Sequence, residues 1–354
     1  MVALGGAHSC LLDASGRVRC WGSHQYGQLG FPELTAGPGA RSMEPVVVAG
    51  LDDAVRVVAG HFHTCAIRRG GSVVCWGHGG HGQLGTGATE DSVLPAPVAL
   101  GDAAVELALG EGHTCARLAT RRVVCWGRND FGQLGDGSTE ARLAPAPVEG
   151  LDDAAAIGAG RDHACARRGD GRVLCWGAAY EGQLGTGERP DRRERPVPVD
   201  LAGAEAIAIG SAHGCALVAE GAVRCWGRND GRQVGNGEGG DPADVQLAPA
   251  PVRGIEGAVE IAAAARHTCA RLASGVVRCW GYNGFGQLGD GSDEERETPV
   301  DVSGIDDAVG LAVGVRHGCV LRRSGGVACW GRNHEGQLGD WTTEARHAPV
   351  PVRL

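Results

Sequence analysis

Residues 113–154 read HTCARLATRRVVCWGRNDFGQLGDGSTEARLAPAPVEGLDDA, and the rest of the chain repeats this pattern. Its fixed points are a His two residues before a Cys, a second Cys ten residues later that precedes Trp-Gly, and then Gly-Gln-Leu-Gly. The first Cys recurs at Cys10, Cys65, Cys115, Cys165, Cys215, Cys269 and Cys319, so the gaps are 55, 50, 50, 50, 54 and 50 residues. A period this regular indicates a repeat protein, in which each unit packs on its neighbours.

The second Cys of each copy is equally regular, and the two series use all 14 cysteines of the chain. The second series is Cys20, Cys75, Cys125, Cys175, Cys225, Cys279 and Cys329, each followed by a Trp. A Pro-Val segment closes every copy. We therefore expect one domain over residues 1–354, with seven repeat units near 1–50, 51–100, 101–150, 151–200, 201–254, 255–304 and 305–354.

Within a copy, the apolar runs are short, rich in Val and bounded by Gly and Asp, which is typical of strands. In the second copy we expect strands at residues 54–60, 63–67 and 73–76, and a fourth at the Pro-Val segment, where an edge position tolerates proline. About 20 residues would connect the third strand to the fourth. Four short antiparallel strands repeated seven times predict an all-β fold, a seven-bladed β-propeller of four-stranded antiparallel blades.

The spacing leaves two ways to close the ring. Each blade could be built from consecutive strands, so that the ring closes by packing alone, or the last strand could complete the first blade. We favour the first arrangement.

The two cysteines of each copy are placed to pair across a hairpin. A Gly stands four residues before the second Cys in every copy except one, where Arg121 replaces it. A Gly there suits the left-handed third position of a three-residue loop, and the resulting register sets the cysteines directly opposite each other. We predict seven disulfides within blades: Cys10–Cys20, Cys65–Cys75, Cys115–Cys125, Cys165–Cys175, Cys215–Cys225, Cys269–Cys279 and Cys319–Cys329.

Paired cysteines in every copy favour an oxidising compartment, so we expect an extracytoplasmic protein that is secreted, periplasmic or on the cell surface. Because Met1 leads directly into repeat sequence, the leader peptide would be absent from this chain. A cytoplasmic location is the alternative.

The composition argues against several functional classes. A net charge of −9 disfavours sequence-independent binding to nucleic-acid phosphates. The apolar runs are far shorter than the roughly 20 residues of a membrane helix, so we expect no membrane span. The glycine-rich segment at residues 77–82 matches a dinucleotide-binding spacing but opens no helix, so we expect no such site. We expect no cofactor and no catalytic residues.

The repeated His-x-Cys pattern could be drawn as a zinc site, because His and Cys share one side of the strand. However, the paired cysteines are neighbours across strands, and the His lies roughly 7 Å further along. The three side chains would not converge, so we predict no metal. We expect the histidines to hydrogen-bond one blade to the next instead.

The string Trp-Gly-Arg-Asn-Asp-Phe-Gly-Gln-Leu-Gly at residues 126–135, with Gly-x-x-His-Thr upstream, resembles the regulator-of-chromosome-condensation repeat. The resemblance covers essentially the whole chain and implies a seven-bladed propeller. The paired cysteines point to a bacterial, cysteine-paired type of the family. Known members include a nucleotide exchange factor for a nuclear GTPase, a plant ultraviolet-B photoreceptor and a secreted bacterial β-lactamase inhibitor, so the fold does not define the function.

Two of these activities fit the sequence poorly. The photoreceptor motif Gly-Trp-Arg-His-Thr is replaced by His61-Phe62 and by Glu111-Gly112 at the matching positions, so the sensing Trp is missing. The exchange factor works through an inserted wedge and a basic tail, whereas this chain is acidic and its insertions are four or five residues long.

The residues that differ most between copies are the two before each repeated His, and function should reside where copies differ. These pairs and the two insertions lie in loops that we expect on one face. The predicted function is a non-enzymatic, monomeric protein-binding propeller, exported and stabilised by disulfides. A propeller enzyme (hydrolase or lyase) with an axial site is the alternative, followed by a GTPase exchange factor. The predicted partner-binding residues are Tyr26, His61, Phe62, Arg266, Arg316 and Trp341, and Tyr26 could instead stabilise its own loop.

Overall fold

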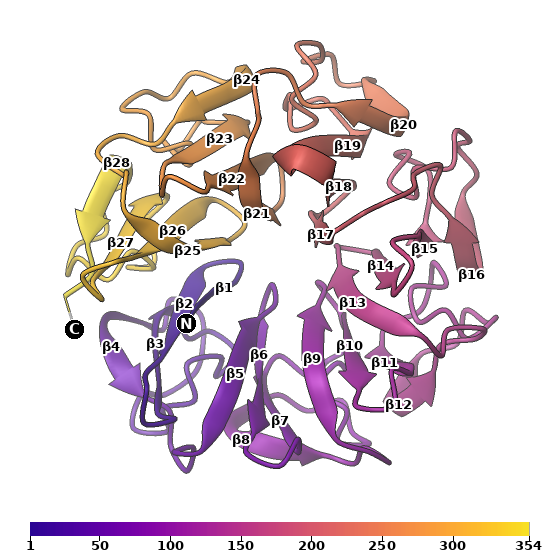
Figure 1. Ribbon diagram of the computed structural model, residues 1–354. Coiled ribbons are helices and arrows are strands. Elements are labelled where there is room, and N and C mark those ends of the chain that lie inside the picture. The colour runs from indigo at the N-terminus through magenta and orange to yellow at the C-terminus, as the bar shows by residue number, and fades with distance from the viewer. Residues whose placement is uncertain (354) are drawn as a thin grey trace.

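The computed structural model describes residues 1–353, and in it seven four-stranded antiparallel sheets surround a central axis (Figure 1). The only helical segment of the described residues is the short 3₁₀ turn η1 (Ala219–Gly221). The predicted all-β fold, a seven-bladed propeller, is confirmed. No helix in residues 1–353 is long and apolar enough to cross a membrane.

Each blade contains four consecutive strands, ordered from the axis outward. The innermost strands are β1 (Val2–Leu4), β5 (Ala54–Ala59), β9 (Ala104–Leu109), β13 (Ala154–Ala159), β17 (Ala206–Ile209), β21 (Ala258–Ala263) and β25 (Ala308–Val313). The second strands are β2 (His8–Leu12), β6 (His63–Arg68), β10 (His113–Leu118), β14 (His163–Arg168), β18 (His213–Val218), β22 (His267–Leu272) and β26 (His317–Arg322).

The third strands are β3 (Val18–Ser23), β7 (Val73–Gly77), β11 (Val123–Gly127), β15 (Val173–Ala178), β19 (Ala222–Arg228), β23 (Val277–Gly281) and β27 (Val327–Gly331). The outermost strands are β4 (Arg41–Val47), β8 (Ser92–Val98), β12 (Arg142–Pro147), β16 (Arg192–Pro198), β20 (Val245–Pro251), β24 (Arg296–Asp301) and β28 (Arg346–Pro351). We number the blades 1 to 7 in this order.

The hairpin between the second and third strands sets the position of the cysteines. In blade 2, a three-residue loop ends at Gly71, whose φ of +88° is left-handed, and Cys65 pairs in register with Cys75. All seven predicted cysteine pairs are disulfides, with Cα atoms 4.0–4.1 Å apart. This short separation is typical of a pair of residues that share no backbone hydrogen bond, where side chains come closest.

The fourth strand is the edge of its blade and carries the prolines, as predicted. It also begins before the Pro-Val segment, so that the connection in blade 3 covers only residues 128–141. Our expected length of about 20 residues was therefore wrong. A register shift between Cys125 and Gly127 accompanies the longer strand, because three residues of β12 lie opposite the single residue Trp126 of β11.

The blade interfaces contain the repeated Trp, and each is fully buried. Trp76 of blade 2 donates from Nε1 to the carbonyl of Gln28 in blade 1, at 3.0 Å. The other six Trp side chains repeat this bond to the preceding blade, at 2.8–3.0 Å. The Gln-Leu segment thus supplies both an acceptor for the indole and a buried Leu, which explains why it recurs.

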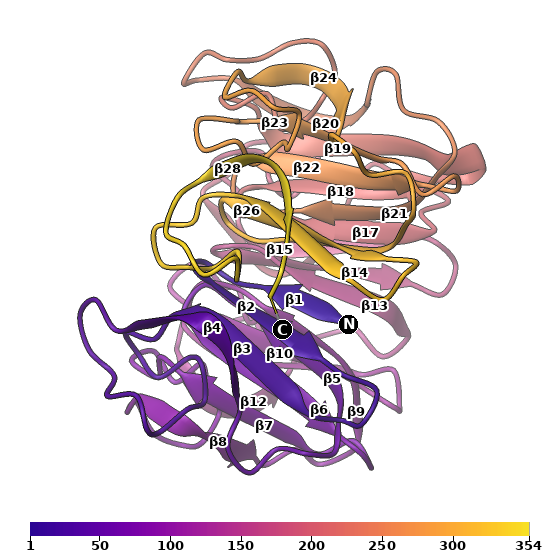
Figure 2. The same cartoon turned by 90° about the vertical axis from the view of Figure 1, so that its left-hand side faces the viewer.

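The ring closes by packing, which is the arrangement we favoured. Blades 1 and 7 each form a complete sheet from their own strands and lie side by side (Figure 2). Trp21 of blade 1 donates to the carbonyl of Gln337 in blade 7 at 2.8 Å, as at every other interface. The closing interface is therefore equivalent to the other six.

Candidate partner-binding face

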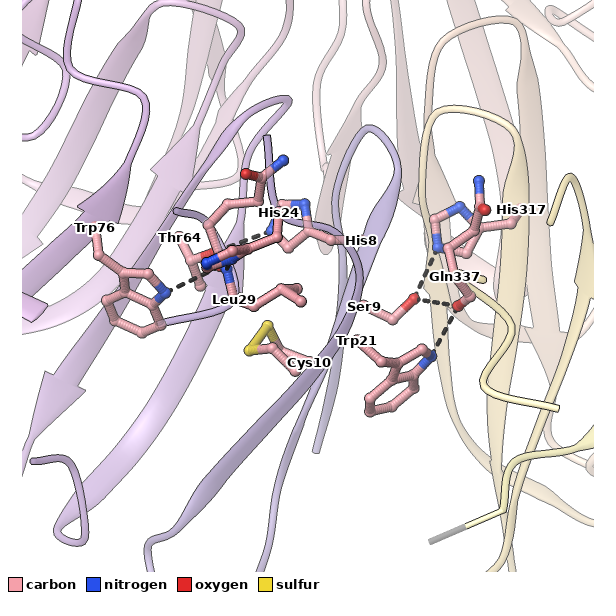
Figure 3. The surroundings of a disulfide bond; sticks show 12 residues. His8, Ser9, Cys10, Trp21, His24, Leu29, Thr64, Trp76, His317 and Gln337 are labelled. Carbon is pink, nitrogen blue, oxygen red and sulfur yellow. Dashed lines mark hydrogen bonds between the residues drawn. A yellow bond between two sulfur atoms is a disulfide. The ribbon is translucent and has the colours of Figure 1, made fainter. Parts of the chain in front are cut away.

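The seven histidines that begin the second strands are fully buried at the blade interfaces. Four of them contact a hydroxyl of the next blade at 2.8–3.0 Å: His8 with Thr64, His63 with Thr114, His213 with Thr268 and His317 with Ser9. Figure 3 shows the contacts of His8 and His317. Because Thr114 Oγ1 donates its own proton to the Gln83 carbonyl, it must accept from His63 Nε2. The predicted role of these histidines is confirmed for four copies.

The remaining three histidines are His113, His163 and His267. At the position of Thr114, the next blade has Ala164, Gly214 and Gly318, which lack a hydroxyl. Both ring nitrogens of these histidines have no hydrogen-bond partner within the described residues.

Burial lowers the pKa of every histidine in this ring, to about 3 for His63 and about 4 for His113. A neutral, enclosed imidazole has no access to substrate, so these residues belong to the scaffold. The cysteine sulfurs beside them are consumed in disulfides. Within residues 1–353 no group of three or more His, Cys, Asp or Glu side chains converges on a point.

The loops between first and second strands lie on the same face as the loops between third and fourth strands. We call this the loop face, and the side with the Gly hairpins the hairpin face. Phe62 from a loop of the first kind packs against Tyr26 and His78 from loops of the second kind, which shows that they meet.

The first residue of each variable pair lines the mouth of a cavity of about 350 Å³ on the propeller axis. Its walls are mainly small and aliphatic side chains of the innermost strands, such as Ile157, Ile207 and Ile261. At the mouth, His61 Nδ1 lies 3.9 Å from a carboxylate oxygen of Glu111. Burial lowers the pKa of His61, while the charge of Glu111 opposes this and that of Arg316 reinforces it.

In four copies the second residue of the pair contacts a side chain of the preceding blade, and the chemistry of this slot between blades changes around the ring. These residues are Phe62, Asp162, Arg266 and Arg316. Between blades 1 and 2 the slot is aromatic. Five rings are in sequential contact, with centroids 4.2–6.3 Å apart. We call this the aromatic cluster: Tyr26, His61, Phe62, His78 and His81.

Across blades 3 to 6 the slots contain alternating charges instead. Successive partners lie 2.6–3.8 Å apart, in the order Arg128, Asp162, Arg161, Glu181, Arg228, Asp230 and Arg266. Although burial raises the pKa of Asp230, hydrogen bonding and the charges of Arg228 and Arg266 bring it below its ordinary value. Asp130 also pairs with Arg128, so every arginine of this ion-pair arc contacts a carboxylate, and the arc links the loops of neighbouring blades.

Between blades 6 and 7, two arginines share one aromatic ring. The guanidinium of Arg316 lies 5.1 Å from the centroid of Phe285, and that of Arg332 lies 5.7 Å from it. His334 meets the same ring edge-on at 6.0 Å.

The predicted residues thus have different environments. Tyr26, His61 and Phe62 are brought together in the aromatic cluster, and Tyr26 packs on the next blade. Arg266 belongs to the ion-pair arc and stacks on Tyr282. Trp341 is 49% exposed and stacks with Arg353, so no contact joins it to the other five within the described residues.

Sequence reasoning missed His78, His81 and Arg332. The signal was available, because His78 and Arg332 directly follow a Trp-Gly and vary between copies. Each of these slots is filled by two loops, the one before the repeated His and the one after Trp-Gly.

The family model of the RCC1-like domain matches residues 1–208, more than half of the chain. The chain belongs to the RCC1-like family. Models of the regulator of chromosome condensation (RCC1) repeat match residues 220–271 and 274–321 as well, so the RCC1-like character continues through the later blades. The predicted family is confirmed.

Curated relatives match this RCC1-like propeller over short segments. Human RCC1 domain-containing protein 1 is 37% identical over 83 residues, which is 23% of this chain and 21% of that protein. The human probable E3 ubiquitin-protein ligase HERC6 is 35% identical over 86 residues, 24% of this chain and 8% of that protein. These matches therefore represent a small part of both relatives.

Solved structures match the whole RCC1-like propeller. Prp20p from Saccharomyces cerevisiae, described with its binding properties to Gsp1p and histones, has a TM-score of 0.85 at 20% identity, covering 98% of this chain and 88% of that one. Human WBSCR16 has a TM-score of 0.84 at 21% identity, covering 96% and 94%. At these identities the likeness concerns the fold alone.

Proposed function

We propose that this chain is a non-enzymatic protein-binding propeller whose loop face engages the partner. The aromatic cluster is the observation that carries the proposal. Its five rings are contributed by separate loops of blades 1 and 2, and Tyr26, His61 and Phe62 remain partly exposed. Partly exposed aromatic side chains are the commonest energetic centres of protein interfaces. A protein partner also agrees with the binding to Gsp1p and histones named for Prp20p.

The direct test is to capture partners from native extracts, identify them by mass spectrometry, and measure the affinity of a purified partner. Phe62→Ala, Arg266→Ala and Arg316→Ala should each weaken binding at least about tenfold, or 1.4 kcal/mol. Trp341→Ala tests whether the site extends to the rim beside Arg353. The matched controls are Asp52→Ala, Asp152→Ala and Asp306→Ala, exposed residues on the hairpin face. Equal losses from these controls would place the binding site elsewhere.

We also propose that the protein is exported. Seven disulfides within blades favour an oxidising, extracytoplasmic compartment. Protein isolated from its native source should keep its intact mass when alkylated without reductant, because every thiol is oxidised. Fourteen alkylated thiols would contradict both the pairing and the compartment.

An axial hydrolase or lyase is the second candidate, because His61 and Glu111 form a pair found in one place on the rim of the cavity. A His–carboxylate pair can serve in general acid–base chemistry. Screening against glycans and esters tests this candidate, with Glu111→Gln as the variant that removes the carboxylate. Turnover that is lost in Glu111→Gln would replace the binding proposal.

A further inference from the structure

Arg316 and Arg332 differ from the arginines of the ion-pair arc in having no acidic partner. Arg128, Arg161, Arg228 and Arg266 each contact a carboxylate in the ion-pair arc. Within residues 1–353, neither Arg316 nor Arg332 forms a salt bridge. The nearby carboxylate of Glu335 instead lies 3.8 Å from Arg41.

The hydrogen-bond donors of this arginine pair are also largely unused. Arg332 Nε lies 3.3 Å from His334 Nδ1, but the Nη groups of Arg332 and the whole guanidinium of Arg316 make no hydrogen bond in the described part of the protein. Burial and the charge of Arg316 lower the pKa of Arg332, against the opposing charge of Glu335. The two cations are thus half-buried and held near each other, and neither forms a salt bridge within residues 1–353.

Phe285 holds these side chains in place. A guanidinium within about 6 Å of a phenyl centroid is attracted to the ring, which restricts the arginine and leaves its edge free to hydrogen-bond. The guanidinium edges of Arg316 and Arg332 around the Phe285 ring provide a preorganised set of hydrogen-bond donors for a planar anion. A carboxylate matches this geometry and charge.

We infer that Arg316, Arg332 and Phe285 form a recognition site for an Asp or Glu side chain of the partner protein, an inference that rests on the proposed function. The loops of blades 7, 1 and 2 support a continuous contact surface. Val315 donates to the Gly5 carbonyl, and Gly6 donates to the His61 carbonyl, so that the blade 1 loop lies between the other two. Gly6 is too close to the His61 ring and carbonyl to carry a side chain, so this loop packs directly against the aromatic cluster. A partner segment with a carboxylate at one end and an apolar side chain at the other would contact both the arginine pair and the aromatic cluster.

The four Phe residues of the chain allow a direct assay. Protein labelled with para-fluorophenylalanine should give four fluorine NMR signals, assigned with Phe→Leu variants. Phe285 reports on the arginine pair and Phe62 on the aromatic cluster, while Phe31 and Phe131 are internal references. The probe is the peptide Ser-Gly-Glu-Glu-Gly-Ser, blocked at both termini so that only its Glu side chains are charged. It is compared at low ionic strength with the same peptide in which Gln replaces both Glu.

The Glu peptide should shift the Phe285 signal saturably, with a dissociation constant on the order of 1 mM, and the Gln peptide should not. Arg316→Met and Arg332→Met should each weaken binding at least about tenfold. Arg323→Met is the matched control, because Arg323 is an exposed arginine of the same blade on the hairpin face. Circular dichroism of each variant verifies that the propeller is folded.

An unchanged Phe285 signal, an equal response to the Gln peptide, or full binding by both Met variants would overturn the inference. Inorganic phosphate and acetate are titrated separately, and tighter binding of either free anion than of the Glu peptide would also overturn it. The titration needs no knowledge of the partner. The carboxylate site can therefore fail while Phe62→Ala still weakens partner binding, and the proposed function can fail while the peptide still binds.

Discussion

At the scale of single residues, the buried histidines provide an internal comparison, because some have a hydroxyl partner and others do not. Thr114 accepts from His63 and donates to Gln83, whereas Ala164 occupies the same position beside His113. Thr114→Ala should lower the free energy of unfolding by about 1–3 kcal/mol, because a buried imidazole loses its partner. Urea denaturation measures this change.

The complementary substitution is Ala164→Ser. Ser9 shows that a serine can serve here, since it contacts His317 at 3.0 Å and donates to Gln337 at 2.7 Å. We expect Ala164→Ser to raise the free energy of unfolding by up to about 1 kcal/mol. Thr114→Val is the control that keeps the shape and removes only the hydroxyl. A loss from Ala164→Ser as large as that from Thr114→Ala would contradict the assignment.

The same histidines predict that acid destabilises the fold. Their pKa in the folded state is about 3 to 4, below the ordinary 6.5, so the unfolded chain binds more protons at any pH between these values. Stability is therefore complete above pH 6.5 and falls as the pH decreases below it, by roughly 1.4 kcal/mol per histidine per pH unit.

Urea midpoints at about pH 7.5 and about pH 5.5 test this dependence in a window where few carboxylates titrate. His113→Leu should reduce the slope, because it removes one titrating group. Identical midpoints at the two pH values would be incompatible with seven buried neutral histidines.

At the scale of the structural elements, two turns contain bulky residues in a left-handed conformation that other copies assign to Gly. Arg121 has φ of +66° in its hairpin, where the other six copies have Gly, and Trp341 has φ of +67° where Gly137 and Gly291 stand in other copies. A residue with a Cβ is disfavoured in this conformation by about 1–2 kcal/mol.

Arg121→Gly should therefore stabilise the chain by up to about 1 kcal/mol, less than the full strain because Gly also gains freedom in the unfolded state. Trp341→Gly should do the same despite losing the stacking on Arg353. Denaturant unfolding measures both, and Arg121→Ala, which keeps the strained Cβ, should give no gain. If Trp341→Gly stabilises the chain and also weakens partner binding, the strained Trp serves the interface.

At the scale of the whole molecule, closure by packing means that the first and last strands have different importance. β28 pairs only with β27 at the outer edge, whereas β1 lines the axis and packs on β25 and β5. Deleting the residues after His347 should lower the melting temperature but leave a folded protein. Deleting residues 1–5 should abolish cooperative unfolding, because it removes an interior strand from two blade interfaces.

Calorimetry with circular dichroism distinguishes these outcomes. Loss of the folded state on deletion of the residues after His347 would show that the outer strand is essential to ring closure. A mild effect from both deletions would show that closure depends on the second strands, through contacts such as Ser9 with His317.

The sequence by itself determined the number of blades, the strand order and the cysteine pairs. These features are local, because a hairpin such as that between Cys65 and Cys75 is defined by its loop length and its left-handed Gly71. The same hairpin then recurs in each of the seven copies of the repeat. The same logic identified the Trp and His positions as parts of the scaffold.

Only the tertiary structure decided what the loop face contains. Tyr26 meets Phe62, and Phe285 meets Arg316, across blade interfaces that join residues of different copies. Whether an arginine is paired, as Arg266 is with Asp230, or free, as Arg316 is, depends on which side chains the neighbouring blade brings within reach. Repeat spacing is the same at every interface, so it cannot distinguish the aromatic, charged and cationic slots. Their character arises from side-chain packing between blades, which no local sequence pattern specifies.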